Sequence, residues 1–335
     1  VIDVTLYNLR PITKRKDIAV LGGDKESSIV IMKRTDYQNK LQHMLEEGIK
    51  NGKYQETTDT TMKDLKSFQN FLCRNFSKYE KYNDMRPSSH QPARMYLTAK
   101  THKFQNIESI TLDKLKYRPI LDQIGTMTYN TSKIIARYLS PLACNEYVIK
   151  DTLDFPNIIT DNPILQDEED VSYDVESLFT NIPVPETIEY IIKEIYKNNK
   201  LPKTCKKLIF KRLLLKLTSG SLFSANGKFY KQIDGCAMGD PLSVTLSGIY
   251  MCKMEHEVVK PMNPSLYRRY VDDIFYRRKK NAKDTLFENI NNHHQNIKIT
   301  IETEPSKFLD TSLIKYDDNY KKALYRKDRK VPIHW

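Results

Sequence analysis

Residues 270–275 read Tyr270-Val271-Asp272-Asp273-Ile274-Phe275, so two adjacent carboxylates stand between two apolar segments. Aromatic and β-branched segments favour strands, and the sequence predicts a hairpin over 266–277 whose turn is Asp272-Asp273. Tight hairpins usually turn through Asn-Gly or Asp-Gly, and two neighbouring carboxylates repel each other unless a cation lies between them. An acidic pair taken alone is usually a solvated turn, but the apolar flanks argue against that interpretation here.

A third acid, Asp174, lies in the segment Val171-Ser172-Tyr173-Asp174-Val175, which we expect to be a buried strand. If this strand pairs with the hairpin, three carboxylates converge. Carboxylate oxygens are the ligands that Mg²⁺ prefers, and a two-ion site can activate a hydroxyl and stabilise a leaving oxygen in phosphoryl transfer. The residues alone therefore indicate a metal-dependent phosphoryl-transfer enzyme. They leave polymerase and nuclease open.

Charge and composition point to a nucleic-acid partner. The chain has 335 residues, with 54 Lys and Arg against 42 Asp and Glu, a net charge of +12, and 39% hydrophobic residues. A basic globular protein favours a polyanionic partner, with nucleic acid first and an anionic membrane second. No apolar run approaches the roughly 20 residues that span a bilayer, so we expect no membrane association. Five scattered cysteines favour an intracellular compartment, and the start at Val1 suggests a piece of a longer protein.

The hydrophobic periodicity predicts an α+β fold, an antiparallel sheet covered on one face by helices. A second hairpin, 221–233, is expected to turn at Asn226-Gly227, and a helix is expected to start at Asp240-Pro241. Helices are expected near 36–50, 61–82, 127–142, 185–198, 204–218, 242–259 and 283–295. Further strands are expected near 28–32, 94–97, 117–121, 297–303, 308–316 and 320–326.

Several segments follow one another in a characteristic order. They are Gln91-Pro92-Ala93-Arg94-Met95-Tyr96, Thr101-His102-Lys103, Arg118-Pro119-Ile120, the stretch 172–183 around Asp174, the stretch 235–243 with Gly239-Asp240-Pro241, the stretch 267–273, and Lys307-Phe308-Leu309-Asp310. This order resembles the palm of a reverse transcriptase. It is most similar to the Penelope-like retroelements, whose polymerase is akin to telomerase. The resemblance spans most of the chain.

The resemblance implies a catalytic and metal-binding role for Asp174, Asp272 and Asp273, with the Val175 carbonyl completing the shell of the second metal. Two Mg²⁺ ions are the expected cofactors, for which Mn²⁺ could substitute. Phe179 matches the residue under the nucleotide sugar, where an aromatic ring would clash with a 2′-hydroxyl, so DNA is the expected product.

The resemblance also assigns residues that bind the nucleotide and the nucleic acid. Arg118 matches the arginine that pairs with the incoming triphosphate, for which a planar guanidinium is suited. Gly239 matches the glycine that lets the backbone approach the nucleotide. Met238 stands where retroviral enzymes have glutamine, so no side-chain contact to the sugar is carried over from that position. Nucleic-acid contacts are further expected at Lys100, His102, Lys103, Phe308 and Leu309.

The predicted architecture is a right-hand polymerase, with fingers and palm and with the thumb mostly absent. Fingers are expected over 1–165, with 184–235 contributing. The palm is expected over 166–183 and 236–315, and its end or the start of a thumb over 316–335. The predicted activity is that of an RNA-directed DNA polymerase in the nucleus, acting on an RNA template, a DNA primer or target DNA, and deoxynucleoside triphosphates. The alternatives are a metal-dependent nuclease using the same carboxylates and a non-catalytic nucleic-acid-binding protein.

Overall fold

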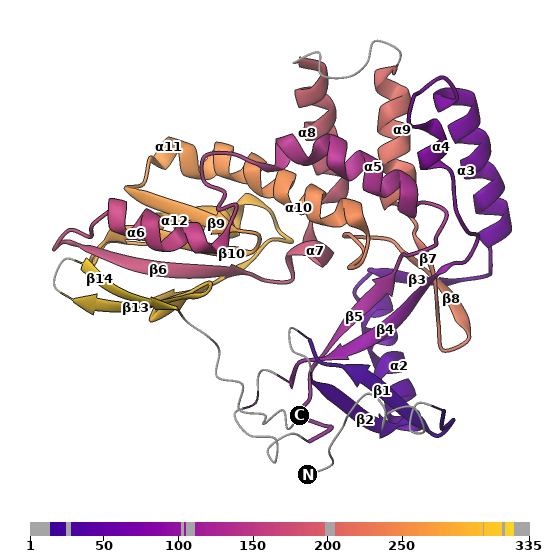
Figure 1. The fold of residues 1–335 in the computed structure, drawn as a ribbon, viewed down its shortest axis with the longest axis horizontal. Coiled ribbons are helices and arrows are strands. Elements are labelled where there is room, and N and C mark those ends of the chain that lie inside the picture. The colour runs from indigo at the N-terminus through magenta and orange to yellow at the C-terminus, as the bar shows by residue number, and fades with distance from the viewer. Residues whose placement is uncertain are drawn as a thin grey trace. The chain divides into compact units, whose positions relative to one another are not determined.

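The structure, a computed structural model, comprises two compact units, each described here by itself (Figure 1). The first unit takes in the chain up to Asn130 together with Ser219–Asp240. The second takes in Thr131–Thr218 and Pro241–Lys327. The residues described are 14–24, 28–101, 104, 111–197, 205–303, 305–316 and 319–324.

The first unit is built on a five-stranded sheet of order β3-β8-β7-β4-β5, beside a separate β1-β2 hairpin. Within the larger sheet β4 and β7 run parallel and the other pairs antiparallel. The predicted hairpin turn Asn226-Gly227 is confirmed, since both residues take positive φ between β7 and β8. The elements are β1 (Ile18–Gly22), β2 (Ile29–Lys33), α2 (Arg34–Lys50), β3 (Tyr54–Thr57), α3 (Thr61–Phe76), α4 (Tyr82–Met85), β4 (Ala93–Ala99), β5 (Tyr117–Asp122), β7 (Leu222–Ala225) and β8 (Lys228–Gln232).

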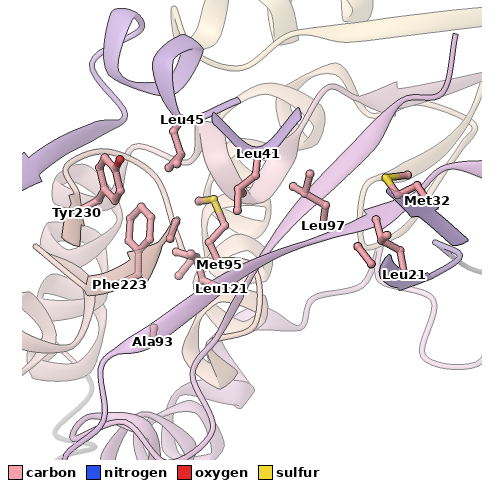
Figure 2. Packing of buried hydrophobic residues seen from close by; sticks show 13 residues of the cluster. Leu21, Met32, Leu41, Leu45, Ala93, Met95, Leu97, Leu121, Phe223 and Tyr230 are labelled. Atoms are coloured by element: carbon pink, nitrogen blue, oxygen red, sulfur yellow. The ribbon is translucent and has the colours of Figure 1, made fainter. Parts of the chain in front are cut away.

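The core of this unit lies between α2 and the five-stranded sheet (Figure 2). Leu41 and Leu45 stand four residues apart on one face of α2 and are buried, as the helical period predicts. They belong to one cluster with Met95 and Leu97, which occupy alternate positions on β4. The cluster therefore holds the sheet in place. Strand β5 of this sheet carries Arg118.

The second unit holds the four-stranded sheet on which the acidic residues lie. Its strand order is β11-β6-β10-β9, with every neighbouring pair antiparallel, and β12, β13 and β14 form a smaller antiparallel sheet. The elements are α5 (Tyr129–Leu139), η3 (Ser140–Ala143), η4 (Thr152–Asp154), α6 (Phe155–Asp161), β6 (Glu168–Val175), α7 (Leu178–Asn181), α8 (Val184–Lys197), α9 (Lys207–Thr218), α10 (Pro241–Met254), η5 (Glu255–Val259), α11 (Lys260–Met262), β9 (Leu266–Tyr270), β10 (Asp273–Lys279), α12 (Thr285–His293), β11 (Ile299–Thr303), β12 (Lys307–Phe308), β13 (Thr311–Tyr316) and β14 (Asn319–Leu324).

Side-chain alternation gives the four-stranded sheet two different faces. On one face, Tyr173 of β6 packs its ring against Phe287 of α12 and donates a hydrogen bond to Asp284. On the other face, Phe275 of β10 packs against Phe155 of α6 and Phe308 of β12. The predicted α+β fold, with an antiparallel sheet backed by helices, is confirmed.

A buried ion pair ties the far end of β10 to β6. The Arg277 Nε lies 2.7 Å from the Asp170 Oδ1, the two residues being directly opposite in the β6–β10 register. Arg277 Nη1 also donates to the carbonyls of Asn162 and Pro163, which follow α6. These polar partners of the buried guanidinium come from β6 and from the segment that precedes it.

Some elements differ from the predictions. The strands β1 and β3 and the helix α6 were not predicted, because each is too short to show a clear period. The predicted strand 308–316 is divided into β12 and β13 by a turn in which Leu309 takes φ 51°. No helix in the described part of the chain is long and apolar enough to cross a membrane.

We predict that Phe275→Ala lowers the free energy of unfolding by about 3–5 kcal/mol, because truncation leaves a cavity against Phe155 and Phe308. Ile314→Ala is the control, since Ile314 is 59% exposed and its loss should change stability by less than about 0.5 kcal/mol. Denaturant unfolding measures both. Equal effects of the two substitutions would contradict the assigned core.

Candidate active site

The turn between β9 and β10 consists of Val271 and Asp272, one residue earlier than the predicted Asp272-Asp273. Tyr270 pairs with Asp273, which is the first residue of β10. Val271 takes φ 56°, whereas Asp272 does not have a positive φ. Positive φ at the first turn position alone is the pattern of a type II′ turn, where glycine is preferred. A β-branched residue in this region is strained, by about 1–3 kcal/mol, and persists only where its surroundings hold it.

The register of β6 and β10 brings the three aspartates together along the backbone. Asp174 lies directly opposite Asp273, and Thr300 and Tyr270 extend the same row across the outer strands. The Val175 amide donates to the Asp272 carbonyl at 3.1 Å, which attaches the turn to the end of β6. The strand carrying Asp174 thus lies beside the hairpin carrying Asp272 and Asp273, which is the condition on which the expected convergence of the three carboxylates depends.

The two cross-strand aspartates lie on the sheet face that also carries Phe275, and so on the face opposite Tyr173 and α12. Along this face Phe275 is buried, whereas Asp174 is exposed and Asp273 is half-buried. Asp174 and Asp273, which with Asp272 we call the acidic row, therefore lie at the exposed end of a face that is otherwise covered. Such a position leaves the carboxylates accessible to a ligand.

The donors at this end of the sheet are chemically suited to a hard divalent cation. Three carboxylates and nearby backbone carbonyls offer only oxygen ligands, the set that Mg²⁺ takes. Within the described ranges, no three His, Cys, Asp or Glu side chains are gathered closely enough to hold one metal ion. The aspartates are thus neighbours in the backbone, and their side chains do not converge on a common point.

Phe179 lies in α7, the short helix that follows β6 and Asp174. Ser177 takes φ 49° just after β6, and this left-handed residue redirects the chain into α7, where Phe179 is half-buried. Val175 is buried, so its role in the predicted site rests on its backbone. Both residues belong to the same compact unit as the three aspartates.

Arg118 lies on β5 of the first unit, and Gly239 adjoins the same strand. The Leu121 amide of β5 donates to the Met238 carbonyl at 2.9 Å, and Gly239 takes φ 122° beside it. A Cβ at position 239 would collide with the Leu121 carbonyl oxygen. The close approach of two backbones thus requires glycine here.

Arg118 has a partner that sequence analysis missed. Its Nη1 lies 2.7 Å from the Oδ1 of Asp24, whose side chain is 8% exposed. In the sequence Asp24 follows Gly22-Gly23 and gave only a turn signal, because no local pattern links it to a residue so distant in the chain. The structure therefore adds Asp24 as the residue that orients the Arg118 guanidinium.

The remaining predicted nucleic-acid contacts are dispersed. Lys100 follows β4, while His102 and Lys103 lie outside the described residues. Phe308 is buried against Phe155, and the next residue, Leu309, is half-buried in a turn. The Phe308 side chain therefore anchors this turn from within the core, and only neighbouring atoms of the turn can meet a ligand.

Comparison with known proteins defines the class of fold. No protein-family model matches the chain, and no curated protein does. The structure is similar to a telomerase from Candida albicans in complex with a TWJ fragment of telomeric RNA, with a TM-score of 0.60 and 11% identity over 91% of this chain and 54% of that chain. It is also similar to an apo telomerase from Candida tropicalis, with a TM-score of 0.57 and 11% identity over 91% of this chain and 56% of that one.

The protein therefore has a right-hand polymerase-like fold. Among solved structures this fold resembles telomerase reverse transcriptase, and the chain spans about half the length of the telomerases it matches. Identity this low shows the fold alone. The roles of Asp174, Asp272, Asp273 and the other predicted site residues stay predictions.

Gly239→Ala should be more destabilising than Gly227→Ala. Both glycines have positive φ, but a Cβ at Gly227 meets nothing within 4 Å, whereas one at Gly239 meets backbone. We expect Gly239→Ala to lower the free energy of unfolding by about 1–3 kcal/mol more than its control, because the β5 backbone has to move. Denaturant unfolding of the two variants measures the difference, and equal losses would be inconsistent with the close approach.

Proposed function

We propose that the protein is an RNA-directed DNA polymerase, the reverse transcriptase of a Penelope-like retroelement. The observation that carries the proposal is the β6–β10 register, which sets Asp174 opposite Asp273 and attaches the Asp272 peptide to Val175. The polymerase-like fold, the order of the sequence motifs and the net charge of +12 support it further.

In the proposed reaction the 3′-hydroxyl oxygen of a DNA primer attacks the α-phosphorus of a deoxynucleoside triphosphate. The new O3′–P bond extends the primer, the bond from the α-phosphorus to the bridging oxygen breaks, and pyrophosphate leaves with its electron pair. The hydroxyl proton passes to solvent or to a nearby base. Base pairing with the RNA template selects the nucleotide.

The residues of the chain divide the work. Asp174, Asp272 and Asp273 would bind two Mg²⁺ ions after rotation of their side chains, with the Val175 carbonyl as a further ligand. Bound there, the ions would acidify the primer hydroxyl and neutralise the leaving pyrophosphate. Arg118, oriented by Asp24, would bind the triphosphate through its planar guanidinium.

Asp272→Asn tests the proposed site. We expect it to lower primer extension by at least about a hundredfold, because it removes a charge worth several kcal/mol to the transition state. The measurement is extension of a labelled DNA primer on an RNA template with deoxynucleotides and Mg²⁺. Asp161→Asn, an exposed aspartate of α6 in the same unit, is the matched control and should extend normally.

The alternatives give different results in the same assay. Extension by Asp272→Asn at the wild-type rate would overturn the assignment of the site. Degradation of the labelled strand without added nucleotides would instead identify a nuclease. Salt-sensitive binding with neither reaction and no metal requirement would identify a nucleic-acid-binding protein.

Phe179 should determine the choice of sugar. In Phe179→Ala we expect ribonucleotide incorporation to rise at least about tenfold relative to deoxynucleotide incorporation, because removal of the ring removes a clash worth about 1–2 kcal/mol with the 2′-hydroxyl. Competition between dATP and ATP in single-nucleotide extension measures this ratio. An unchanged ratio would exclude Phe179 as the residue that contacts the sugar.

A further inference from the structure

Arg269 is a buried cation two residues before the strained turn. It lies on β9, and its side chain is 2% exposed. Its Nε donates to the Glu255 Oε1, and its Nη2 donates to the Glu255 Oε2 at 3.2 Å and approaches the Cys252 Sγ at 3.6 Å. Burial raises the pKa of Cys252 to about 12, so this sulfur is a neutral thiol near pH 7. Glu255 is therefore the counterion of Arg269.

Both carboxylate oxygens of Glu255 accept hydrogen bonds. Its side chain is 0% exposed and begins η5, a π-helical turn that continues from α10. Besides Arg269, its carboxylate accepts hydrogen bonds from the Tyr267 hydroxyl at 3.3 Å and from the Asn145 Nδ2 at 2.7 Å. A buried ion pair is tolerated where the remaining hydrogen-bonding capacity is satisfied in this way. The pair is thus a rigid anchor between η5 and the edge strand β9.

The third arm of the guanidinium reaches the turn. Arg269 Nη1 donates to the Val271 carbonyl at 3.1 Å. The next carbonyl, that of Asp272, accepts from the Val175 amide at 3.1 Å. Two successive carbonyls of the turn are therefore held, one by a buried side chain and one by the end of β6. The first bond holds the peptide plane between Val271 and Asp272, and the second holds the plane between Asp272 and Asp273.

The backbone of Arg269 is held as well. Its amide donates to the Tyr147 carbonyl at 2.9 Å, and its carbonyl accepts from the Ile149 amide at 2.8 Å. The segment 147–149 thus covers the open edge of β9. With backbone and side chain both fixed, the Nη1 donor has little freedom to follow the turn if the turn relaxes.

We propose that Arg269, clamped by Glu255, is a positioning residue that holds Val271 at positive φ and so sets the direction of the Asp272 side chain. The proposal rests on the function proposed above. Without this donor, the valine is free to return to negative φ, where its Cβ has no clash. Asp272 then moves relative to Asp174 and Asp273, although no residue of the acidic row has been altered.

The test uses a variant that removes both charges, Arg269→Met with Glu255→Gln, in which the glutamine carbonyl can still accept from Tyr267 or Asn145. The matched control is Arg277→Met with Asp170→Asn, which removes a second buried ion pair, at the end of β10 that lies farthest from the turn. We expect kcat for primer extension to fall by about tenfold to a hundredfold in the first variant, with KM for the nucleotide changed less than about threefold, because catalytic geometry is lost. The control variant should keep its kcat.

A readout independent of activity is hydrogen exchange at the Val175 amide, whose acceptor is Asp272. In the Arg269 and Glu255 double variant it should speed up at least about tenfold relative to the wild type, while in the Arg277 and Asp170 control it should not. Adding Val271→Gly to the first variant should restore part of the lost kcat, since glycine takes positive φ at no steric cost. A variant with only a loosened fold would gain nothing from that glycine.

Arg269→Lys covers the case in which the double variant does not fold. Lysine keeps a charge opposite Glu255 but lacks the planar fork that reaches Glu255 and Val271 together. It should show the same loss of kcat and the same faster exchange. If a folded Arg269 variant keeps the wild-type kcat and the wild-type rate of hydrogen exchange at the Val175 amide, the positioning role is overturned. A wild-type protein without primer extension would overturn the proposed function instead, and hydrogen exchange would still decide whether Arg269 holds the turn.

Discussion

The antiparallel pairing of β6 with β10 is the constraint on which the site depends. Because side chains alternate along a strand, a slip of one residue would turn Asp273 toward α12 and bury it among aromatic rings. Phe275 in the aromatic core secures the register on one face, and Tyr173 secures it on the other. At the far end, Arg277 and Asp170 lie opposite each other and form an ion pair, as this register requires. Ordinary packing thus places Asp174 opposite Asp273.

The turn that carries Asp272 is secured in another way. The side chain of a valine at φ 56° clashes with its own backbone. A short hairpin alone cannot supply the energy that offsets this strain. In the positioning role proposed for Arg269, the surroundings supply it. Two successive turn carbonyls accept hydrogen bonds, one of them from a buried guanidinium that is paired with a carboxylate. Strain held by a rigid frame is one physical means of pre-organising a site.

Much of this could be predicted from the sequence. The carboxylates at Asp174, Asp272 and Asp273, most helices and both hairpins follow from local patterns, because periodicity and turn chemistry act over a few residues. The shift of the turn to Val271-Asp272 could not be predicted, since it places a β-branched residue at positive φ. The partners Asp24 for Arg118 and Glu255 for Arg269 were also missed. Such pairs join residues far apart in the chain, and only the folded backbone brings them together.

Asp174 and the Asp272-Asp273 pair are proposed to bind divalent metal at one place. Fe²⁺ in the presence of ascorbate and peroxide generates hydroxyl radicals where it is bound, and these cut the polypeptide nearby. We expect cuts near residue 174 and near residues 272–273 in the same protein, both suppressed by excess Mg²⁺ and both lost in Asp272→Asn. Cutting at only one of the two segments, or at neither while other segments are cut, would contradict it.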